Sequence, residues 1–291
     1  MGPSGSPPRE PITAVVSRTA RILVSIFAVT LLAASAAFAG KPGGSGLPNS
    51  MAAIGDSITE AANLDGSNIG ASNPEHSWST GYDSGDIVLS HYERILARNG
   101  KIRGKNFNDA VSGSRMDDAP GQAQQAVAQG VQYVTIEMGG NDVCTSDWTN
   151  MTPVATYESF FRQTMNILTS GLPNAKIYVL SVPDVYQLWR LFDGEWYPEW
   201  IWNTFDVCQS MLDNANTETD RQFVRQRNID FNTVLATVCA QYTQCKFDNN
   251  AIFNYQFARS DVSGVDYFHP SLNGQRNIAQ GSWQVGYWPT I

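Results

Sequence analysis

Short apolar runs alternate with longer amphipathic stretches along most of this chain. Four apolar runs predict strands, at residues 51–54, 107–111, 133–138 and 177–182. Helical periodicity marks residues 86–99, 120–129, 153–169, 220–242 and 272–285. The alternation is typical of an α/β fold, and neither an internal repeat nor a second linker interrupts it. The pattern therefore predicts one three-layer αβα domain with a mainly parallel sheet between helices.

The first 39 residues do not belong to this pattern. Three arginines precede the uncharged run 22–39, which is rich in Leu, Val, Ile and Ala and ends Ala-Phe-Ala. These features predict a secretory signal peptide that is removed after Ala39. An uncleaved membrane anchor is the alternative, because the run is just long enough to span a thin bilayer. Either way the remainder is exported, with residues 40–49 as a flexible lead-in and 50–291 as the domain.

The composition favours a globular protein with an acidic surface. Hydrophobic residues make up 42% of the chain and charged residues 16%, which excludes wholesale disorder and a multi-span membrane protein. The formal charge is −8, and it becomes −10 when residues 1–39 take three Arg and one Glu with them. Such a surface argues against nucleic acid as a partner and against tight docking on anionic membranes.

The four cysteines all lie beyond the predicted cleavage point. An even number in an exported protein indicates two disulfides, and three pairings are possible. We favour a local bridge between Cys239 and Cys245, which leaves Cys144 to pair with Cys208. Their spacing does not resemble that of paired zinc ligands.

Three of the predicted strand ends carry glycine beside a polar side chain, at the edge where parallel sheets bind ligands. The motif G-D-S follows the first strand and exposes Ser57. Gly113 follows the second strand, where a bare backbone N–H can approach a substrate. G-G-N-D follows the third and offers the amide of Asn141. Each motif alone is ordinary turn chemistry, to which we assign Asp56 and Asp142.

A serine nucleophile needs a base, and the chain has three histidines. His91 lies within the predicted helix 86–99 as a boundary or surface residue. His76 lies in a polar loop and has no carboxylate placed by the sequence to orient it. His269 differs, because Asp266 precedes it by three residues and can fold back on the imidazole.

In this order, the motifs resemble those of the SGNH (GDSL) hydrolase superfamily. The resemblance extends from about residue 51 to about residue 275 and includes all four lettered residues: Ser57, Gly113, Asn141 and His269. It implies a flavodoxin-like domain with a mainly parallel five-stranded sheet. An ordinary α/β-hydrolase is disfavoured, because the chain contains no G-x-S-x-G elbow.

The resemblance implies an ester hydrolase that forms an acyl-enzyme. Ser57 is expected to be the nucleophile, His269 its base, and Asp266 the group that orients the ring. The backbone N–H groups of Ser57 and Gly113 and the side-chain amide of Asn141 are expected to form the oxyanion hole. We expect a monomer that needs neither a metal ion nor an organic cofactor.

The substrate is left open by these motifs. Similar enzymes include short-chain esterases, lipases, phospholipases and carbohydrate deacetylases. The segment 189–202 holds four of the eight tryptophans, which suit an acyl pocket, a transient lipid interface, sugar rings or simple packing of the loop. A noncatalytic secreted binding protein that has kept the fold is the alternative from another functional class.

Overall fold

The computed structural model describes residues 46–290 of the chain. The predicted signal peptide and residues 40–45 of the predicted lead-in lie outside the described residues. The part of the lead-in that is described lies against the domain, because Leu47 is buried and Asn99 Nδ2 donates to the carbonyl of Pro48 at 2.8 Å. Within residues 46–290, no helix combines the length and hydropathy needed to cross a membrane.

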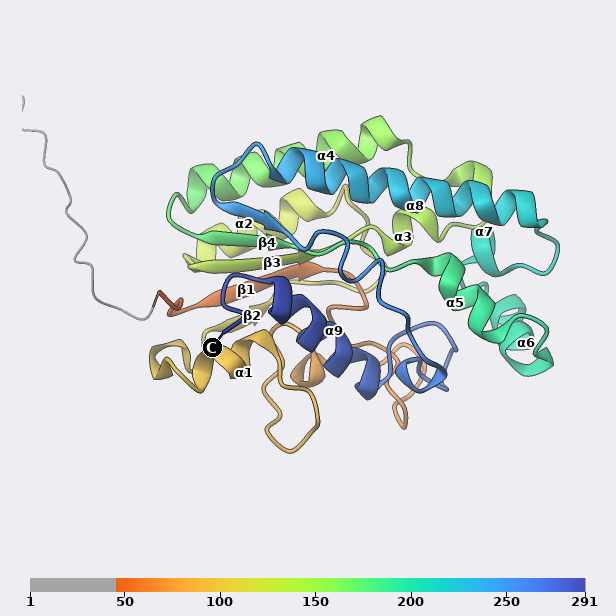
Figure 1. The fold of residues 1–291 in the computed structure, drawn as a ribbon, viewed down its shortest axis with the longest axis horizontal. Coiled ribbons are helices and arrows are strands. Elements are labelled where there is room, and N and C mark those ends of the chain that lie inside the picture. Colours follow the sequence, from red (N-terminus) through yellow and green to blue (C-terminus); the bar gives the residue numbers. More distant parts are fainter. Residues whose placement is uncertain (1–45, 291) are drawn as a thin grey trace, which may run out of the picture. The chain divides into compact units, whose positions relative to one another are not determined.

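The centre of the fold is a five-stranded sheet in which all strands are parallel (Figure 1). The strands are β1 (Met51–Gly55), β2 (Asn106–Asn108), β3 (Tyr133–Glu137), β4 (Lys176–Val179) and β5 (Cys245–Phe247), in the order β2-β1-β3-β4-β5. The predicted α/β class and parallel sheet are confirmed. β2 and β4 are shorter than predicted, and β5 was not recognised because three residues of Cys-Lys-Phe carry almost no pattern.

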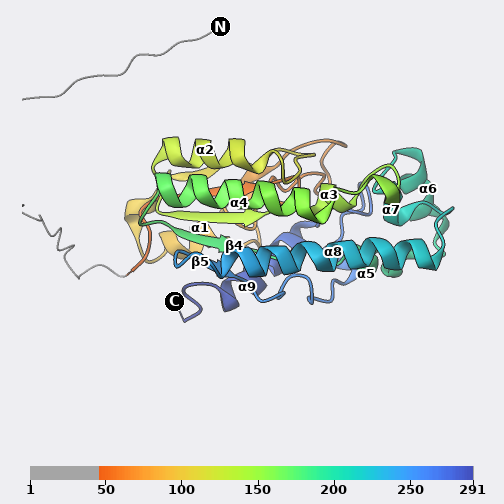
Figure 2. The same ribbon diagram turned by 90° about the horizontal axis from the view of Figure 1, so that it is seen from above.

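Helices cover both faces of the sheet, which gives the three layers (Figures 1 and 2). One face carries α2 (Ala119–Gln129), α4 (Val154–Gly171) and α8 (Glu218–Cys239), and the other carries α1 (His91–Leu96) and α9 (Leu272–Val285). Alternate residues of each strand supply the two cores. Ala52 and Ile54 belong to the core beneath α2, α4 and α8, whereas Met51 and Tyr133 belong to the core beneath α1 and α9.

The start of α1 corrects one prediction. The helix begins after Ser90 rather than at Asp86, because Ser90 and Glu93 form a reciprocal capping box. Asp86 instead accepts the N–H of Val88 at 2.6 Å and lies outside the helix. The S-x-x-E spacing of residues 90–93 was the sequence signal for this boundary.

The remaining elements lie in the connections. They are η1 (Pro74–His76), η2 (Gly100–Ile102), α3 (Gly140–Val143), η3 (Trp148–Asn150), α5 (Val185–Phe192), α6 (Trp196–Thr204), α7 (Gln209–Leu212) and η4 (Arg259–Asp261). α5, α6 and α7 follow β4 and form one end of the domain in Figure 1. Both predicted disulfides are present, Cys239 with Cys245 and Cys144 with Cys208. The second bridge ties the segment after α3 to the start of α7.

Candidate active site

Ser57 lies two residues beyond the end of β1, in a turn that requires glycine. A Cβ atom at Gly55 would lie 2.4 Å from Thr59 Oγ1 and 2.9 Å from the carbonyl oxygen of Glu137, so a side chain there has no room. Asp56 Oδ1 accepts the N–H of Ile58 at 3.0 Å and closes the turn, as its assignment to a turn predicted. The turn fixes Ser57 at the carboxyl edge of the sheet.

His269 connects Ser57 to Asp266. Its Nε2 lies 2.7 Å from Ser57 Oγ, and its Nδ1 lies 2.5 Å from Asp266 Oδ2. Asp266 Oδ1 accepts the backbone N–H groups of Phe268 and His269 at 2.9 and 3.0 Å. Burial alone would raise the pKa of Asp266, but the hydrogen bonds and charge of His269 and these backbone donors lower it overall. Asp266 therefore stays ionised and can orient the imidazole.

Asn63 also belongs to this arrangement, and sequence reasoning missed it. Its Nδ2 donates to Asp266 Oδ2 at 2.7 Å, while its Oδ1 accepts the N–H of Gly70 at 2.6 Å. The backbone of Asn63 has a φ of 55°, in the left-handed region that Asn tolerates better than most residues. Asn63 thus orients the carboxylate of Asp266, which in turn orients the imidazole of His269.

The other two histidines lie away from Ser57. His91 is wholly buried rather than at the surface, with Nδ1 2.9 Å from Tyr133 Oη and Nε2 2.9 Å from Ser282 Oγ. Burial, together with the charge of Arg94, lowers the pKa of His91 to about 3, so it packs as a neutral core residue. The prediction that His91 is a boundary or surface residue is therefore wrong.

His76 does have a carboxylate partner, which the sequence did not indicate. Its Nδ1 lies 2.6 Å from Asp86 Oδ2, and ligand atoms of His76, Asp83 and Asp86 lie within 4.8 Å of one another. This trio is the group within residues 46–290 whose spacing would suit a metal ion. It lies outside the cavity that contains Ser57.

The predicted oxyanion donors gather around the same cavity as Ser57 and His269, which has a volume of about 440 Å³. Asn141 Nδ2 donates one hydrogen bond to the carbonyl of Ser114 at 2.9 Å, which orients the amide. Gly113 adopts a φ of +84° and is exposed at the cavity. Within the described residues, the N–H groups of Ser57 and Gly113 have no acceptor, so they are free to meet a bound oxygen.

Gly139 explains why Asn141 can approach the cavity. Its φ is +137°, and a Cβ atom there would lie 2.7 Å from Val182 Cγ2 and 2.9 Å from Tyr157 Oη. The chain therefore turns sharply at the end of β3 and brings the first residues of α3 to the carboxyl edge. Tyr157 supports this turn by donating to the carbonyl of Met138 at 2.8 Å.

Three buried carboxyl groups lie beneath the site. Burial raises the pKa of Asp56 and that of Asp142 to about 6, and burial with the neighbouring Asp56 raises the pKa of Glu137 well above its ordinary value. Asp142 Oδ2 accepts the N–H of Met116 at 2.9 Å, so it links two loops, and its predicted assignment to its own turn was wrong. The raised pKa of Glu137 favours its protonated form, and the imidazole in contact with Ser57 Oγ is that of His269.

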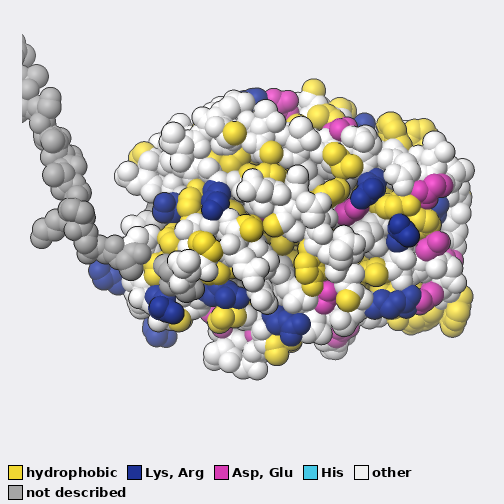
Figure 3. Space-filling model, in the orientation of Figure 1, with side chains coloured by type: hydrophobic (Ala, Val, Ile, Leu, Met, Phe, Trp, Pro, Cys, Tyr) yellow, Lys and Arg dark blue, Asp and Glu magenta, His cyan; other side chains and the backbone are white. Residues whose placement is uncertain are grey.

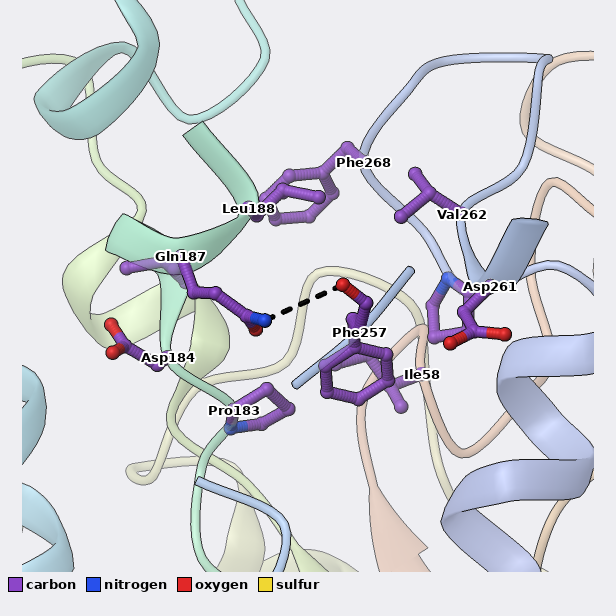
Figure 4. Close-up of a pocket in the computed structure, with 11 residues that line it drawn as sticks. Ile58, Pro183, Asp184, Gln187, Leu188, Phe257, Asp261, Val262 and Phe268 are labelled. Atoms are coloured by element: carbon purple, nitrogen blue, oxygen red, sulfur yellow. Dashed lines mark hydrogen bonds between the residues drawn. The ribbon is translucent and has the colours of Figure 1, made fainter. Parts of the chain in front are cut away.

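A smaller apolar pocket, of about 60 Å³, adjoins the site (Figure 4). Ile58, Leu188 and Val262 line it together with Phe268, whose side chain also lines the cavity of Ser57. Phe268 precedes His269 and lies with its ring centroid 5.0 Å from the imidazole. This ring thus separates a polar, reactive cavity from an apolar one.

The solved structures that resemble this chain include a lipase, a carbohydrate esterase and a phospholipase. An extracellular lipase from Streptomyces rimosus is 18% identical with a TM-score of 0.49, covering 81% of this chain and 99% of that one. A family 3 carbohydrate esterase from Clostridium thermocellum is 13% identical with a TM-score of 0.46, covering 81% and 93%. Phospholipase A1 from Streptomyces albidoflavus is 17% identical with a TM-score of 0.44, covering 78% and 94%.

No curated protein matches the chain in sequence. The model of the GDSL-like Lipase/Acylhydrolase family does match, over residues 53–276. That range begins within β1, ends within α9, and contains every residue of the arrangement around Ser57 described above. The chain therefore belongs to the GDSL-like lipase/acylhydrolase family of ester hydrolases.

Proposed function

We propose that the protein is a secreted serine carboxylic ester hydrolase that works through an acyl-enzyme on Ser57. The observation that carries this proposal is the continuous chain of hydrogen-bonded groups from Ser57 Oγ through His269 to Asp266, at 2.7 and 2.5 Å. A hydroxyl, a base and an ionised carboxylate in this order are what acyl transfer requires.

The first half of the reaction forms the acyl-enzyme. Ser57 Oγ attacks the ester carbonyl while its proton passes to His269 Nε2. The imidazolium, stabilised by Asp266, then gives that proton to the leaving alkoxide, and the alcohol departs as the C–O bond breaks. In the second half, water attacks the acyl group, His269 accepts its proton, and return of a proton to Ser57 Oγ releases the acid.

Negative charge on each tetrahedral intermediate would be met by three donors. These are the backbone N–H groups of Ser57 and Gly113, which lack acceptors among the described residues, and the second N–H of the Asn141 amide. The first N–H of that amide is held by Ser114, so the donor is oriented before substrate binds.

Export and the monomeric state belong to the same proposal. The predicted signal peptide would direct the chain out of the cytoplasm, into surroundings in which two disulfides can form and persist.

Phospholipase or carbohydrate deacetylase activity remains within the proposed mechanism, since both cleave an ester with the same groups. The wall of the cavity is mixed, with Asn63 and Asp206 beside Ile69 and Phe205.

A serine-reactive p-nitrophenyl phosphonate tests the proposal. We expect stoichiometric labelling of the wild type, mapped by peptide mass spectrometry to Ser57, and no labelling of Ser57→Ala. Ser67→Ala, at a half-buried loop serine that hydrogen-bonds the carbonyl of Leu64, serves as the matched control and should label like the wild type. Folded wild type that neither labels nor hydrolyses p-nitrophenyl esters would instead be a noncatalytic binding protein.

A further inference from the structure

Four aromatic rings on and just beyond α6 face solvent. The exposed fraction is 78% for Trp196, 41% for Tyr197, 50% for Trp200 and 50% for Phe205. Successive ring centroids lie 5.3, 5.9 and 6.4 Å apart, so the rings form one continuous surface, here called the α6 aromatic patch. Figure 3 shows hydrophobic side chains gathered at the end of the domain where α6 lies. A continuous exposed apolar patch on a soluble domain indicates a binding surface.

The packing of α6 fixes these rings in their outward direction. Ile201 and Trp202 occupy its inner face, and Trp202 is fully buried with its Nε1 donating to the carbonyl of Tyr267 at 3.2 Å. The ring of Tyr197 also packs edge-on against Tyr267, with centroids 5.7 Å apart. Turning the helix to hide Trp196 would pull Trp202 out of the core, so the exposure of the patch is built into the fold.

The patch is continuous with the cavity of Ser57. Phe205 belongs to the patch and also lines that cavity. Two aliphatic side chains, each with a 56% exposed fraction, belong to other segments that line the same cavity. Ile69 lines it directly, and Val111 immediately precedes Ser112, which lines it. Three separate segments that line the cavity therefore each carry an exposed apolar side chain.

This distribution fits a lipid surface better than a polysaccharide strand. Aromatic rings can stack on sugars, but Ile69 and Val111 have no ring face to offer. Apolar groups from three segments that line the cavity instead contact a broad apolar surface at once. Tryptophan and tyrosine favour the boundary between water and hydrocarbon, because an apolar ring and a polar N–H or O–H are satisfied there together.

The charges near the patch indicate which kind of lipid surface it fits. The carboxylate of Glu195 is paired with Arg259, and Glu199 Oε1 accepts the N–H of Gly194 at 2.7 Å. Asp206 follows Phe205 and lines the cavity. The charge of Arg259 is neutralised by Glu195, and the chain as a whole carries a formal charge of −8. The charged side chains named here carry a net negative charge, so the fitting partner is an uncharged or zwitterionic lipid aggregate.

We propose that the α6 aromatic patch, with Ile69 and Val111, docks the protein on a zwitterionic lipid surface and places the cavity of Ser57 over it. An ester held in that surface then enters the cavity without crossing water. This inference rests on the proposed function and deepens it, because it names the substrate class as esters presented in lipid aggregates.

The test separates docking from chemistry with two double variants. Trp196→Ser/Trp200→Ser removes two rings of the patch that do not line the cavity of Ser57. Tyr82→Ser/Phe223→Ser is the matched control, because these rings are 58% and 47% exposed and neither lines the cavity. Each protein is cosedimented with phosphatidylcholine vesicles and assayed on dissolved p-nitrophenyl acetate.

We expect the tryptophan variant to bind the vesicles at least about tenfold more weakly than the wild type, because it lacks two exposed rings that docking would bury in the lipid. The control variant should bind as the wild type does, and hydrolysis of the dissolved ester should be unchanged in both. Replacing part of the phosphatidylcholine by phosphatidylserine should not strengthen binding.

Several outcomes would overturn the inference. Wild type that does not bind phosphatidylcholine vesicles, or a tryptophan variant that binds as well as the wild type, removes the docking surface. Tryptophan-dependent binding to acetylated xylan without binding to vesicles assigns the patch to a polysaccharide instead. Vesicle binding that depends on the tryptophans, in a protein that hydrolyses no ester, would retain the docking surface and reject the proposed function.

Discussion

Residues 46–290 contain two histidine–aspartate pairs, and one of the two faces a serine. His269 Nδ1 lies 2.5 Å from Asp266, and His76 Nδ1 lies 2.6 Å from Asp86, so the two pairs are nearly identical at this nitrogen. They differ at Nε2. That atom of His269 lies 2.7 Å from Ser57 Oγ, whereas that of His76 has Glu75 at 3.9 Å. A carboxylate can orient an imidazole anywhere, but the reaction depends on what the other nitrogen faces.

The prediction with the largest expected effect tests directly whether the two histidines differ in function. His269→Ala should lower kcat/KM for a p-nitrophenyl ester by about 10⁴ or more, because the proposed nucleophile, Ser57, loses its base. His76→Ala removes an imidazole of the same local geometry and should leave kcat/KM within about twofold, since it lies outside the cavity. Steady-state kinetics on the two purified variants decides the point. Comparable losses in both would mean that the wrong pair has been assigned.

A variant of Asn141 tests the proposed oxyanion hole. Asn141→Ala should lower kcat by roughly 10² to 10³, the usual loss when one donor is removed from an oxyanion hole. KM should change little, because the donor acts mainly on the charge that develops in the transition state. An unchanged kcat would remove Asn141 from this role.

The carboxyl groups differ as well, and their pKa values predict opposite responses to pH. The pKa of Asp142 is raised by burial to about 6 in the folded protein from an ordinary 3.8, so the folded state holds its proton longer than the unfolded state. Its contribution to stability is complete below the unfolded pKa and is lost as the pH rises through about 6. Asp266, whose pKa is lowered, contributes stability that is lost as the pH falls.

Titration of Asp142 should lower the free energy of unfolding of the wild type by about 2 kcal/mol between about pH 4 and pH 6. Asp142→Asn should remove this contribution. The amide oxygen can still accept the N–H of Met116, so the link between the two loops is kept. Urea unfolding at a series of pH values measures the difference. If the two curves stay parallel, Asp142 is not held protonated in the fold.

Asn63 gives the smallest expected effect. Asn63→Ala removes one donor from Asp266 and should lower kcat/KM about tenfold, the usual consequence of losing a hydrogen bond to a charged group. Because Asn63 acts through Asp266 and His269, the acidic limb of the pH–rate profile should also shift. A merely structural role would lower the activity at every pH equally. Asn73→Ala is the matched control, since that nearby asparagine donates only to backbone carbonyls.

The sequence was sufficient wherever the pattern was local and strong. β1, β3 and α9 have near-uniform burial or clear periodicity, and their predicted bounds lie within one residue of the structure. The start of α1 was missed because Asp86 and Ser90 are both good caps, and only Ser90 has its glutamate three residues on. β2 was predicted too long because Ala110 and Val111 extend its apolar pattern beyond the pairing with β1.

The candidate site was predictable as far as it is written in motifs. Ser57, Gly113, Asn141 and His269 were all found at strand ends or in the terminal loop, and the structure brings them to one cavity. Asn63 was not found, because its role depends on a contact with a carboxylate 203 residues later in the chain. Its own neighbourhood, Ala-Ala-Asn-Leu-Asp, reads as an ordinary loop. A local sequence pattern does not indicate a contact between residues so far apart in the chain.

The bridge between Cys144 and Cys208 has a practical consequence for producing this protein. Both cysteines line the cavity of Ser57, and the bridge fastens the wall that carries Phe205 to the segment that follows Asn141. Expression in a reducing cytoplasm would leave this wall unfastened, although the contact between Ser57 and His269 does not pass through it. Such a preparation should still cleave small dissolved esters while failing on lipid aggregates. The host compartment, and not only the assay, then decides which activity is recorded.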